Sequence, residues 1–126
     1  KRNLKIRSFF APNHIYDENT LKALRTSGIK IIIDGYGLFP YFKDQILFVP
    51  QLFYKEIILP FGIQSTQMHI NYWNDKNFED FEILINKENR KIINLDYIID
   101  ITDPNVFQSI SNYLVEKTLK TIRVFR

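Results

Sequence analysis

The chain has 126 residues, of which 45% are hydrophobic and 15% aromatic, and its 17 basic and 14 acidic residues give a formal net charge of +3. This length and apolar content are enough for one core, so we expect residues 1–126 to be a single domain or a fragment of one. The absence of cysteine excludes disulfide bridges, thiolate metal sites and a cysteine nucleophile. No apolar run approaches the roughly 20 residues of a membrane helix, and no strand interleaves aromatic and basic residues as RNA-binding sheets do. We therefore expect no membrane segment and no nucleic-acid partner.

Residues 8–35 have the pattern of a β–α–β unit. A short apolar run stops at Pro12, which has no amide hydrogen to give to a sheet. Asp17 is the expected N-cap of a helix that Gly28 ends. The run over residues 29–33 is continuous and β-branched, as in parallel strands that are buried on both faces. The unit predicts two parallel strands joined by a helix.

Three polar residues follow predicted strands, namely His14, Asp34 and His69. In parallel α/β folds, ligands bind where the carboxyl ends of strands meet the loops. We therefore expect these residues on one rim. The alternatives are ordinary: an exposed loop histidine, a turn aspartate before glycine, and a core-edge histidine bonded to a backbone carbonyl.

The rest of the chain continues the alternation of strands and helices. Residues 36–42 are aromatic and contain glycine, and they predict a loop or lid over the same rim, which either packs or grips a ring-shaped ligand. The further expected elements are strands over 46–49, 63–70 and 92–95, a helix capped by Asn74 or Asp75, and a helical turn over 96–101.

The last helix is expected to begin at the N-cap and N1 pair Asp103-Pro104. Its apolar residues recur at roughly heptad spacing, which favours an ordinary core-facing helix over a partner-binding one. These residues are Val106, Phe107, Ile110, Tyr113, Leu114, Leu119 and Ile122. The basic residues near both termini could meet an anionic polymer, but such runs more often solvate a surface.

Three segments resemble the polysaccharide deacetylase-like proteins, in particular a divergent branch of the NodB-homology group related to carbohydrate esterase family four. They read FFAPNHIYDENTLKAL, GIKIIIDGYGLFP and PFGIQSTQMHIN, within residues 6–90. The resemblance implies an α/β fold, a partial (β/α) barrel that forms the C-terminal half of a distorted seven-stranded deacetylase-type barrel. The chain opens on Lys1, and the metal-binding half would lie upstream of it.

Members of that family remove acetyl groups from N-acetylated sugars with a divalent metal, zinc or a similar ion. Their Asp-Asp pair and His-x-x-x-His motif do not occur here, because the chain has only two histidines and no Asp-Asp dipeptide. The resemblance thus implies a metal in the intact protein and none held by this chain, which alone is expected to be inactive as a hydrolase. The implied partners are a glycan substrate and the missing N-terminal half, or self-association.

The resemblance assigns the roles of the family's motif residues to the matching positions of this sequence. His69 follows Met68 in the position of the fifth motif, Leu-x-His, with Gln67 where leucine is usual, and is the implied general acid. Asp34 takes the place of the aspartate that orients this histidine. Phe10 stands where the third motif has arginine, so His14 is expected to compensate. The predicted catalytic residues are His69 and Asp34, and the predicted substrate-binding residues are Pro12, Asn13, His14, Tyr36 and Trp73.

Two other functions stay open. The first is a non-catalytic carbohydrate-binding or degenerate deacetylase domain, in which aromatic side chains stack on sugar rings. Those side chains are Tyr36, Phe39, Tyr41, Tyr72 and Trp73. The second is a structural or interaction domain without a ligand.

Overall fold

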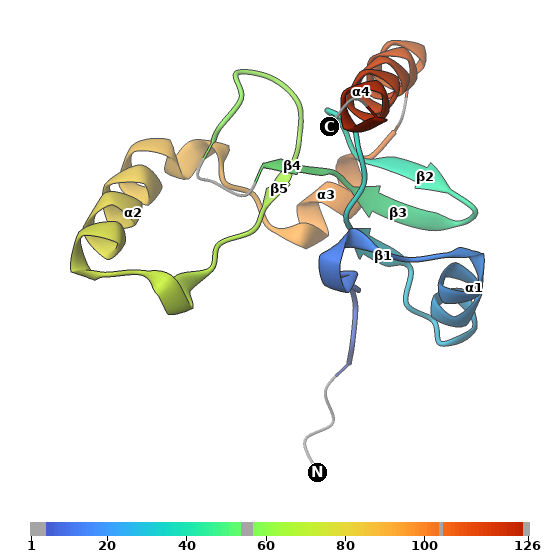
Figure 1. Cartoon of the computed structure of the whole chain (residues 1–126), viewed down its shortest axis with the longest axis horizontal. Helices are drawn as coiled ribbons and strands as arrows, with labels where there is room; N and C mark the ends of the chain where they lie inside the picture. The colour runs from blue at the N-terminus through green and yellow to red at the C-terminus, as the bar shows by residue number, and fades with distance from the viewer. Residues whose placement is uncertain (1–4, 54–56, 104, 125–126) are drawn as a thin grey trace.

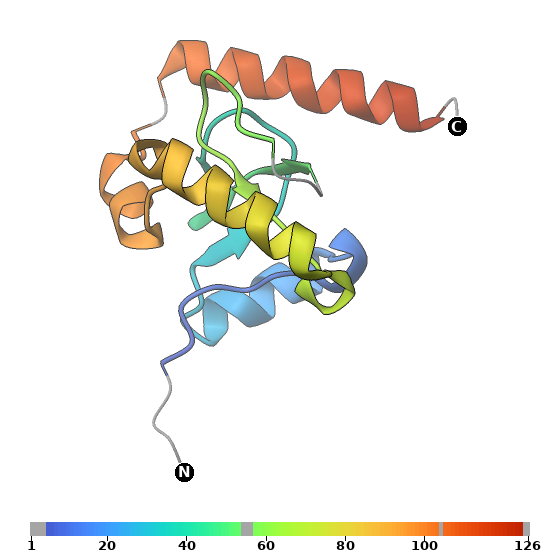
Figure 2. The ribbon, with the colours of Figure 1, turned by 90° about the vertical axis from the view of Figure 1, so that its left-hand side faces the viewer.

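The structure is a computed structural model that describes residues 5–53, 57–103 and 105–124 (Figure 1). The α-helices are α1 (Glu18–Thr26), α2 (Asp75–Glu88), α3 (Leu95–Ile101) and α4 (Val106–Val124). The strands are β1 (Ile31–Ile33), β2 (Tyr41–Lys43), β3 (Ile46–Val49), β4 (Gln51–Phe53) and β5 (Ser65–Thr66), and short 3₁₀ turns cover Pro12–His14, Ile70–Tyr72 and Asn89–Lys91. The long helix α4 runs along the side of the molecule opposite the N-terminal segment in both views (Figures 1 and 2).

The main sheet has the order β1-β3-β2, with β1 parallel and β2 antiparallel to β3. Phe9 adds a parallel bridge to Ile32 on the outer side of β1. Helix α1 lies in the chain between these two parallel partners, which confirms the connection of the predicted β–α–β unit, but its first strand is reduced to the single bridge at Phe9. The chain passes from β3 through Pro50 into β4, which pairs in parallel with β5 in a second, two-stranded sheet.

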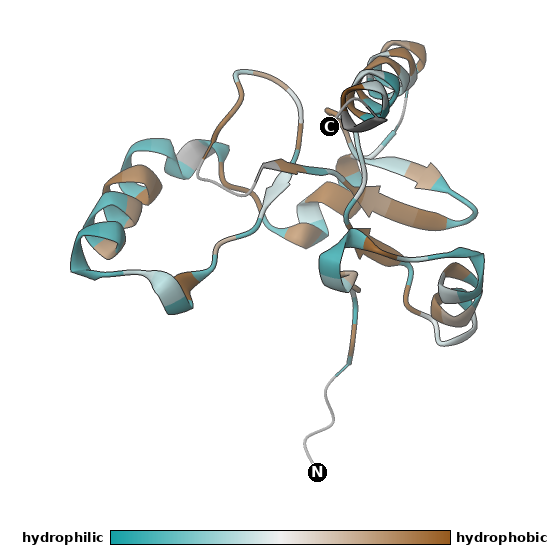
Figure 3. Cartoon of the chain, in the orientation of Figure 1, coloured by the Kyte–Doolittle hydropathy of each residue, from teal (hydrophilic) through white to brown (hydrophobic). Residues whose placement is uncertain are grey.

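Alternating residues of β1 and β3 build two apolar clusters on opposite faces of the sheet. Ile32, Ile46 and Phe48 pack with two leucines of α1 on one face. On the other face, Ile31, Leu47 and Val49 pack with Ile98 of α3. Both strands are uniformly apolar in Figure 3. The sheet is therefore covered on both sides, as the β-branched run predicted.

Both predicted ends of α1 are confirmed. Asp17 accepts a hydrogen bond from the backbone N–H of Thr20 at 2.8 Å. This bond lowers the pKa of the Asp17 carboxyl. Gly28 has a φ of +75°, the left-handed conformation in which glycine ends a helix.

Three predicted segments differ from the structure. The run 92–95 was expected as a strand, but Asn94 accepts a hydrogen bond from Tyr97 N at 2.8 Å and starts α3 instead. The predicted loop over 36–42 includes the first two residues of β2. The predicted strand over 63–70 is reduced to Ser65–Thr66, because only that pair has a strand partner in the described part of the chain.

Helix α4 does not face the core as predicted. Asn105 accepts a hydrogen bond from Gln108 N, so the helix is capped there and not at Asp103, while Pro104 lies outside the described residues. Leu119 of the predicted stripe is half-buried, but six other apolar residues of α4 are more than half exposed. Heptad spacing alone could not reveal this, because periodicity defines a stripe and not what covers it. The six exposed residues are Val106, Phe107, Ile110, Tyr113, Leu114 and Ile122.

One buried side chain fastens α4 to the rest of the molecule. Asn112 accepts hydrogen bonds from the N–H groups of Leu38 and Phe39, at 2.8 and 3.0 Å, and donates to the carbonyl of Phe39 at 2.9 Å. Phe107 adds an edge contact with the ring of Phe39. Gly37 lies so close that a Cβ there would be 2.7 Å from the Asn112 Oδ1 atom.

The deacetylase-type partial barrel stays a prediction, since a β–α–β unit with a mixed sheet is compatible with several α/β folds. In the described part of the chain, every helix is too short or too polar to cross a membrane.

Candidate functional site

The first element of the site is the tight turn that follows the Phe9 bridge. Pro12 begins a 3₁₀ turn in which Asn13 and His14 both have left-handed φ angles, 54° and 57°. Asparagine and histidine tolerate this region better than most residues, although it is costly. The ring of Phe10 meets that of His14 edge-on, with 5.3 Å between centroids. The turn thus holds the His14 side chain beside the end of β1.

Asp34, the first residue after β1, binds this histidine. His14 Nδ1 lies 2.9 Å from Asp34 Oδ1, and the two side chains are 17% and 7% exposed. The same oxygen accepts a hydrogen bond from the N–H of Gly35 at 2.6 Å. The other oxygen of Asp34 is buried and has no hydrogen-bond partner among the described residues. An ionised carboxylate only accepts hydrogen bonds, so we assign a hydrogen to the Nδ1 atom of His14, which donates it to Asp34.

This contact corrects the predicted pairing of Asp34 with His69. Both histidines follow strand ends, and sequence position could not decide which one the carboxyl group would bind. Both histidines nevertheless line the same pocket, which has a volume of about 290 Å³. The other described residues of its lining are Phe10, Asn13 and Gln67.

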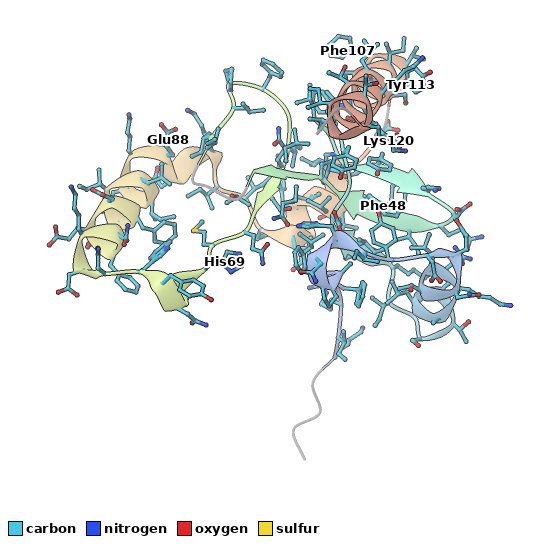
Figure 4. The ribbon with its side chains drawn as sticks, viewed as in Figure 1. Phe48, His69, Glu88, Phe107, Tyr113 and Lys120 are labelled. Carbon is cyan, nitrogen blue, oxygen red and sulfur yellow. The ribbon has the colours of Figure 1, made fainter. Side chains whose placement is uncertain are left out.

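The second half of the pocket comes from the segment that follows β5. Figure 4 shows His69 on this segment, between β5 and α2. Gln67 and His69, two positions apart on this segment, both line the pocket. Met68, between them, lines a separate apolar pocket against α2. Gln67 receives a long hydrogen bond, 3.5 Å, from the amide nitrogen of the buried Gln51 in β4.

Two partly buried tyrosines, Tyr16 and Tyr41, pack against the apolar cluster under α1 and feel the charge of Asp34. Burial raises the pKa of Tyr16 to about 12, and the negative charge of Asp34 adds to the effect. Burial is also the main reason for the raised pKa of Tyr41, whose ring stacks on Phe48 at 5.2 Å. Both phenols therefore stay neutral over the ordinary pH range.

The predicted binding residues divide into two groups. Asn13 and His14 line the pocket, whereas Pro12, Tyr36 and Trp73 are not among its described lining residues. Trp73 packs edge-to-face on two phenylalanines of α2, with centroids 5.1 and 5.2 Å away. Its role in the structure is packing.

The proposed sugar-stacking aromatics are also largely used inside the protein. Tyr41 stacks on Phe48, and Phe39 meets Phe107. Tyr72 is different, because it is 87% exposed and its ring centroid lies 6.4 Å from that of His69.

Gln67 was not predicted as a site residue. Its only sequence signal was that it occupies the usual leucine position of the fifth deacetylase motif. Its alternation with His69 around Met68 could have placed it on the same side of the segment.

The described residues do not fit the divalent metal that the deacetylase resemblance implies. No group of three histidine, aspartate or glutamate side chains in this part of the chain could hold a metal ion. Two imidazoles line the pocket, and one already binds Asp34. Comparisons of the chain with protein-family models, with curated proteins and with solved structures give no match.

Proposed function

We propose that this chain supplies the sugar-binding and proton-transfer side of a deacetylase that acts on N-acetylated sugars. The observation that carries the proposal is that both histidines line one pocket, with His14 bonded to a buried aspartate. Such a pair is the usual device for holding an imidazole in one tautomer for acid–base work.

The proposed acid–base role suits the amine that leaves when an acetamide is hydrolysed. Hydrolysis of an acetamide requires an acid that protonates the departing amine. His14 engages Asp34 through Nδ1, so proton exchange with a ligand would use its Nε2 atom. His69, more exposed and across the pocket, is the second candidate acid. We derive no step through a metal, because the described residues do not provide a site for one.

The size and lining of the pocket support a sugar ligand. A volume of about 290 Å³ is just below the usual range of roughly 300–1,000 Å³ for small-molecule sites, so it suits one small unit of a ligand. Two amide side chains, two imidazoles and one phenylalanine ring offer hydrogen bonds at the rim and an apolar contact. One sugar unit with its acetamido group has the matching mixture of polar and apolar faces.

The test uses the two imidazoles as reporters. We would record long-range ¹H–¹⁵N spectra of the ¹⁵N-labelled chain during titration with a tetramer of N-acetylglucosamine. Because the chain contains two histidines, each signal can be assigned from one His→Ala variant. We expect both imidazole signals to shift together and to saturate, with a glucose tetramer as the control ligand. Unchanged imidazole signals at millimolar tetramer, or equal shifts with the glucose tetramer, would contradict the proposal.

A non-catalytic sugar-binding domain is the second candidate, and the exposed ring of Tyr72 beside His69 favours it. Binding would then depend on stacking more than on the histidines. Tyr72→Ala should abolish tetramer binding in that case, while His14→Ala and His69→Ala should leave the affinity nearly unchanged. The acid–base proposal predicts the opposite order.

A further inference from the structure

We infer that α4 binds an anionic lipid surface, with the apolar side chains of its first turns among the lipid chains and its lysines on the phosphate headgroups. In this arrangement the helix lies along the membrane and does not cross it. The inference is independent of the proposed sugar ligand, because α4 contributes no described residue to the pocket of His14 and His69.

The first half of α4 has its polar and apolar faces exchanged relative to an ordinary surface helix. The residues that face the protein are polar, namely the half-buried Gln108 and Ser111 and the buried Asn112. A helix that only covers a core has the opposite arrangement, and a continuous exposed apolar face marks an interaction site. The apolar residues, all more than half exposed, are Val106, Phe107, Ile110, Tyr113 and Leu114.

Asn112 prevents α4 from turning this face inward. Its side chain makes three hydrogen bonds with the backbone of Leu38 and Phe39. A rotation of the helix by half a turn would break all three bonds and leave polar groups without partners. The fold therefore sets the outward direction of the apolar side chains. In both views no other described segment covers the side of α4 that faces away from the sheet (Figures 1 and 2).

The second half of α4 adds basic charge to the same face. Ile110, Tyr113 and Lys117 are separated by three and four residues, so they follow one another along one side of the helix. The Nζ atom of Lys117 lies 3.4 Å from the Tyr113 hydroxyl and 5.6 Å from the centre of its ring. A tyrosine ring with a lysine at its polar edge is typical of side chains at the level of lipid headgroups.

The charge of α4 is complementary to anionic headgroups. Lys117, Lys120 and Arg123 supply three basic residues, whereas Glu116 is the one acidic residue of the helix. Glu116 is partly buried and is paired with Lys120 at 2.5 Å. The exposed residues between positions 106 and 122 include no acidic one. An apolar face beside unopposed basic residues is the composition of helices that bind anionic membrane surfaces.

A second copy of the chain fits this face less well. In an antiparallel pair, the apolar first half of one helix would lie against the lysines of the other. In a parallel pair, Lys117 would face its counterpart, and like charges repel. An anionic bilayer accepts both halves of the helix, because its chains receive the apolar residues and each lysine near its surface strengthens binding about fivefold.

Vesicle flotation of the 126-residue chain tests the inference. We would compare vesicles of phosphatidylcholine with vesicles in which about one third of the lipid is phosphatidylglycerol. The wild-type chain is expected to bind the anionic vesicles about tenfold or more tightly than the neutral ones. Its affinity for the anionic vesicles should fall as salt is added, because salt screens the lysines from the headgroups.

Two variants of α4 and two matched controls make the test specific. Ile110→Ser should weaken binding to anionic vesicles about tenfold, because it removes an apolar side chain from the face. Lys117→Gln should weaken it about fivefold and leave binding to neutral vesicles unchanged. Ile83→Ser and Lys76→Gln make the same two changes at exposed positions of α2 and should not alter either affinity. Circular dichroism of each variant establishes that the helices are retained.

Two kinds of result would overturn the inference. The first is equal affinity for the two kinds of vesicle, or an affinity that Ile110→Ser and Lys117→Gln leave unchanged. The second comes from sedimentation equilibrium of the lipid-free chain. A dimer that Ile110→Ser dissociates, together with no binding to anionic vesicles, would assign the apolar face of α4 to a second copy of the chain.

Discussion

Replacing Asn112 with alanine removes three hydrogen bonds between α4 and the loop that follows β1. The N–H groups of Leu38 and Phe39 lose their shared acceptor, and the carbonyl of Phe39 loses its donor. Each such bond contributes about 1 kcal/mol net, and more where a buried partner is left unsatisfied. Because both loop residues are partly exposed and water can reach them in part, we expect Asn112→Ala to lower the free energy of unfolding by about 2–4 kcal/mol.

The assay is urea unfolding followed by circular dichroism and tyrosine fluorescence. Ser111→Ala is the matched control, because the Ser111 hydroxyl donates to Gln108 O within the same helix. That variant should change the unfolding free energy by about 0.5 kcal/mol or less. Asn112→Asp should fall between the two, since it keeps the acceptor for both N–H groups but faces the carbonyl of Phe39 with a second oxygen.

A loss below about 1 kcal/mol for Asn112→Ala would refute the reasoning. It would mean that α4 is held mainly by other contacts, such as that of Phe107 with Phe39. Loss of α4 helicity without a change in the main transition would refute it in another way, because it would show that α4 unfolds separately from the sheet. The two results are distinguished by comparing the helical signal with tyrosine fluorescence.

Three other predictions follow from packing and burial. Gly37→Ala would place a Cβ 2.7 Å from Asn112 Oδ1, so it should cost about 1–3 kcal/mol in urea unfolding, and much less in the Asn112→Ala background. Ile32→Ala removes a side chain with 0% exposure from the cluster under α1 and should cost about 2–5 kcal/mol by the same measurement. The raised pKa of Tyr16, about 12 against an ordinary value of 10, favours its neutral form in the folded state, so this stabilisation is complete below pH 10 and is lost as the pH rises toward 12. Thermal melts between pH 8 and 12 should show that Tyr16→Phe flattens this decline, and a decline as steep as in the wild type would assign it to other groups such as Tyr41.

The sequence allowed the β–α–β unit to be predicted because its signals are local. The cap at Asp17, the glycine at position 28 and the β-branched run that becomes β1 each act within a few residues. The prediction of a strand over residues 92–95 was wrong, and the cause is again a local signal. There, Asn94 competes with strand formation by capping the backbone of Tyr97, and a short apolar run cannot outweigh that bond.

The sequence alone could not predict which residues far apart in the chain would contact each other. The rule that parallel strands end on one rim placed His14 and His69 together, and both line one pocket. However, β5 belongs to a different sheet from β1, and the rule could not assign Asp34 to either imidazole. That choice depends on the left-handed turn at Asn13 and His14, which aims the second side chain at the end of β1. The exposure of the α4 stripe is likewise decided by what surrounds the helix, which periodicity does not record.

The turn at Asn13 and His14 links the cost of the fold to its chemistry. Two consecutive non-glycine residues with left-handed φ angles cost on the order of 1–3 kcal/mol each. One described compensation is the bond from His14 to the 7%-exposed side chain of Asp34, whose Oδ1 atom also receives the N–H of Gly35. The Asp44–Gln45 turn between β2 and β3 has the same pair of left-handed residues, so this conformation also occurs in a turn that only connects strands. What distinguishes the Asn13–His14 turn is that it places the imidazole of His14 against Asp34 and in the same pocket as His69.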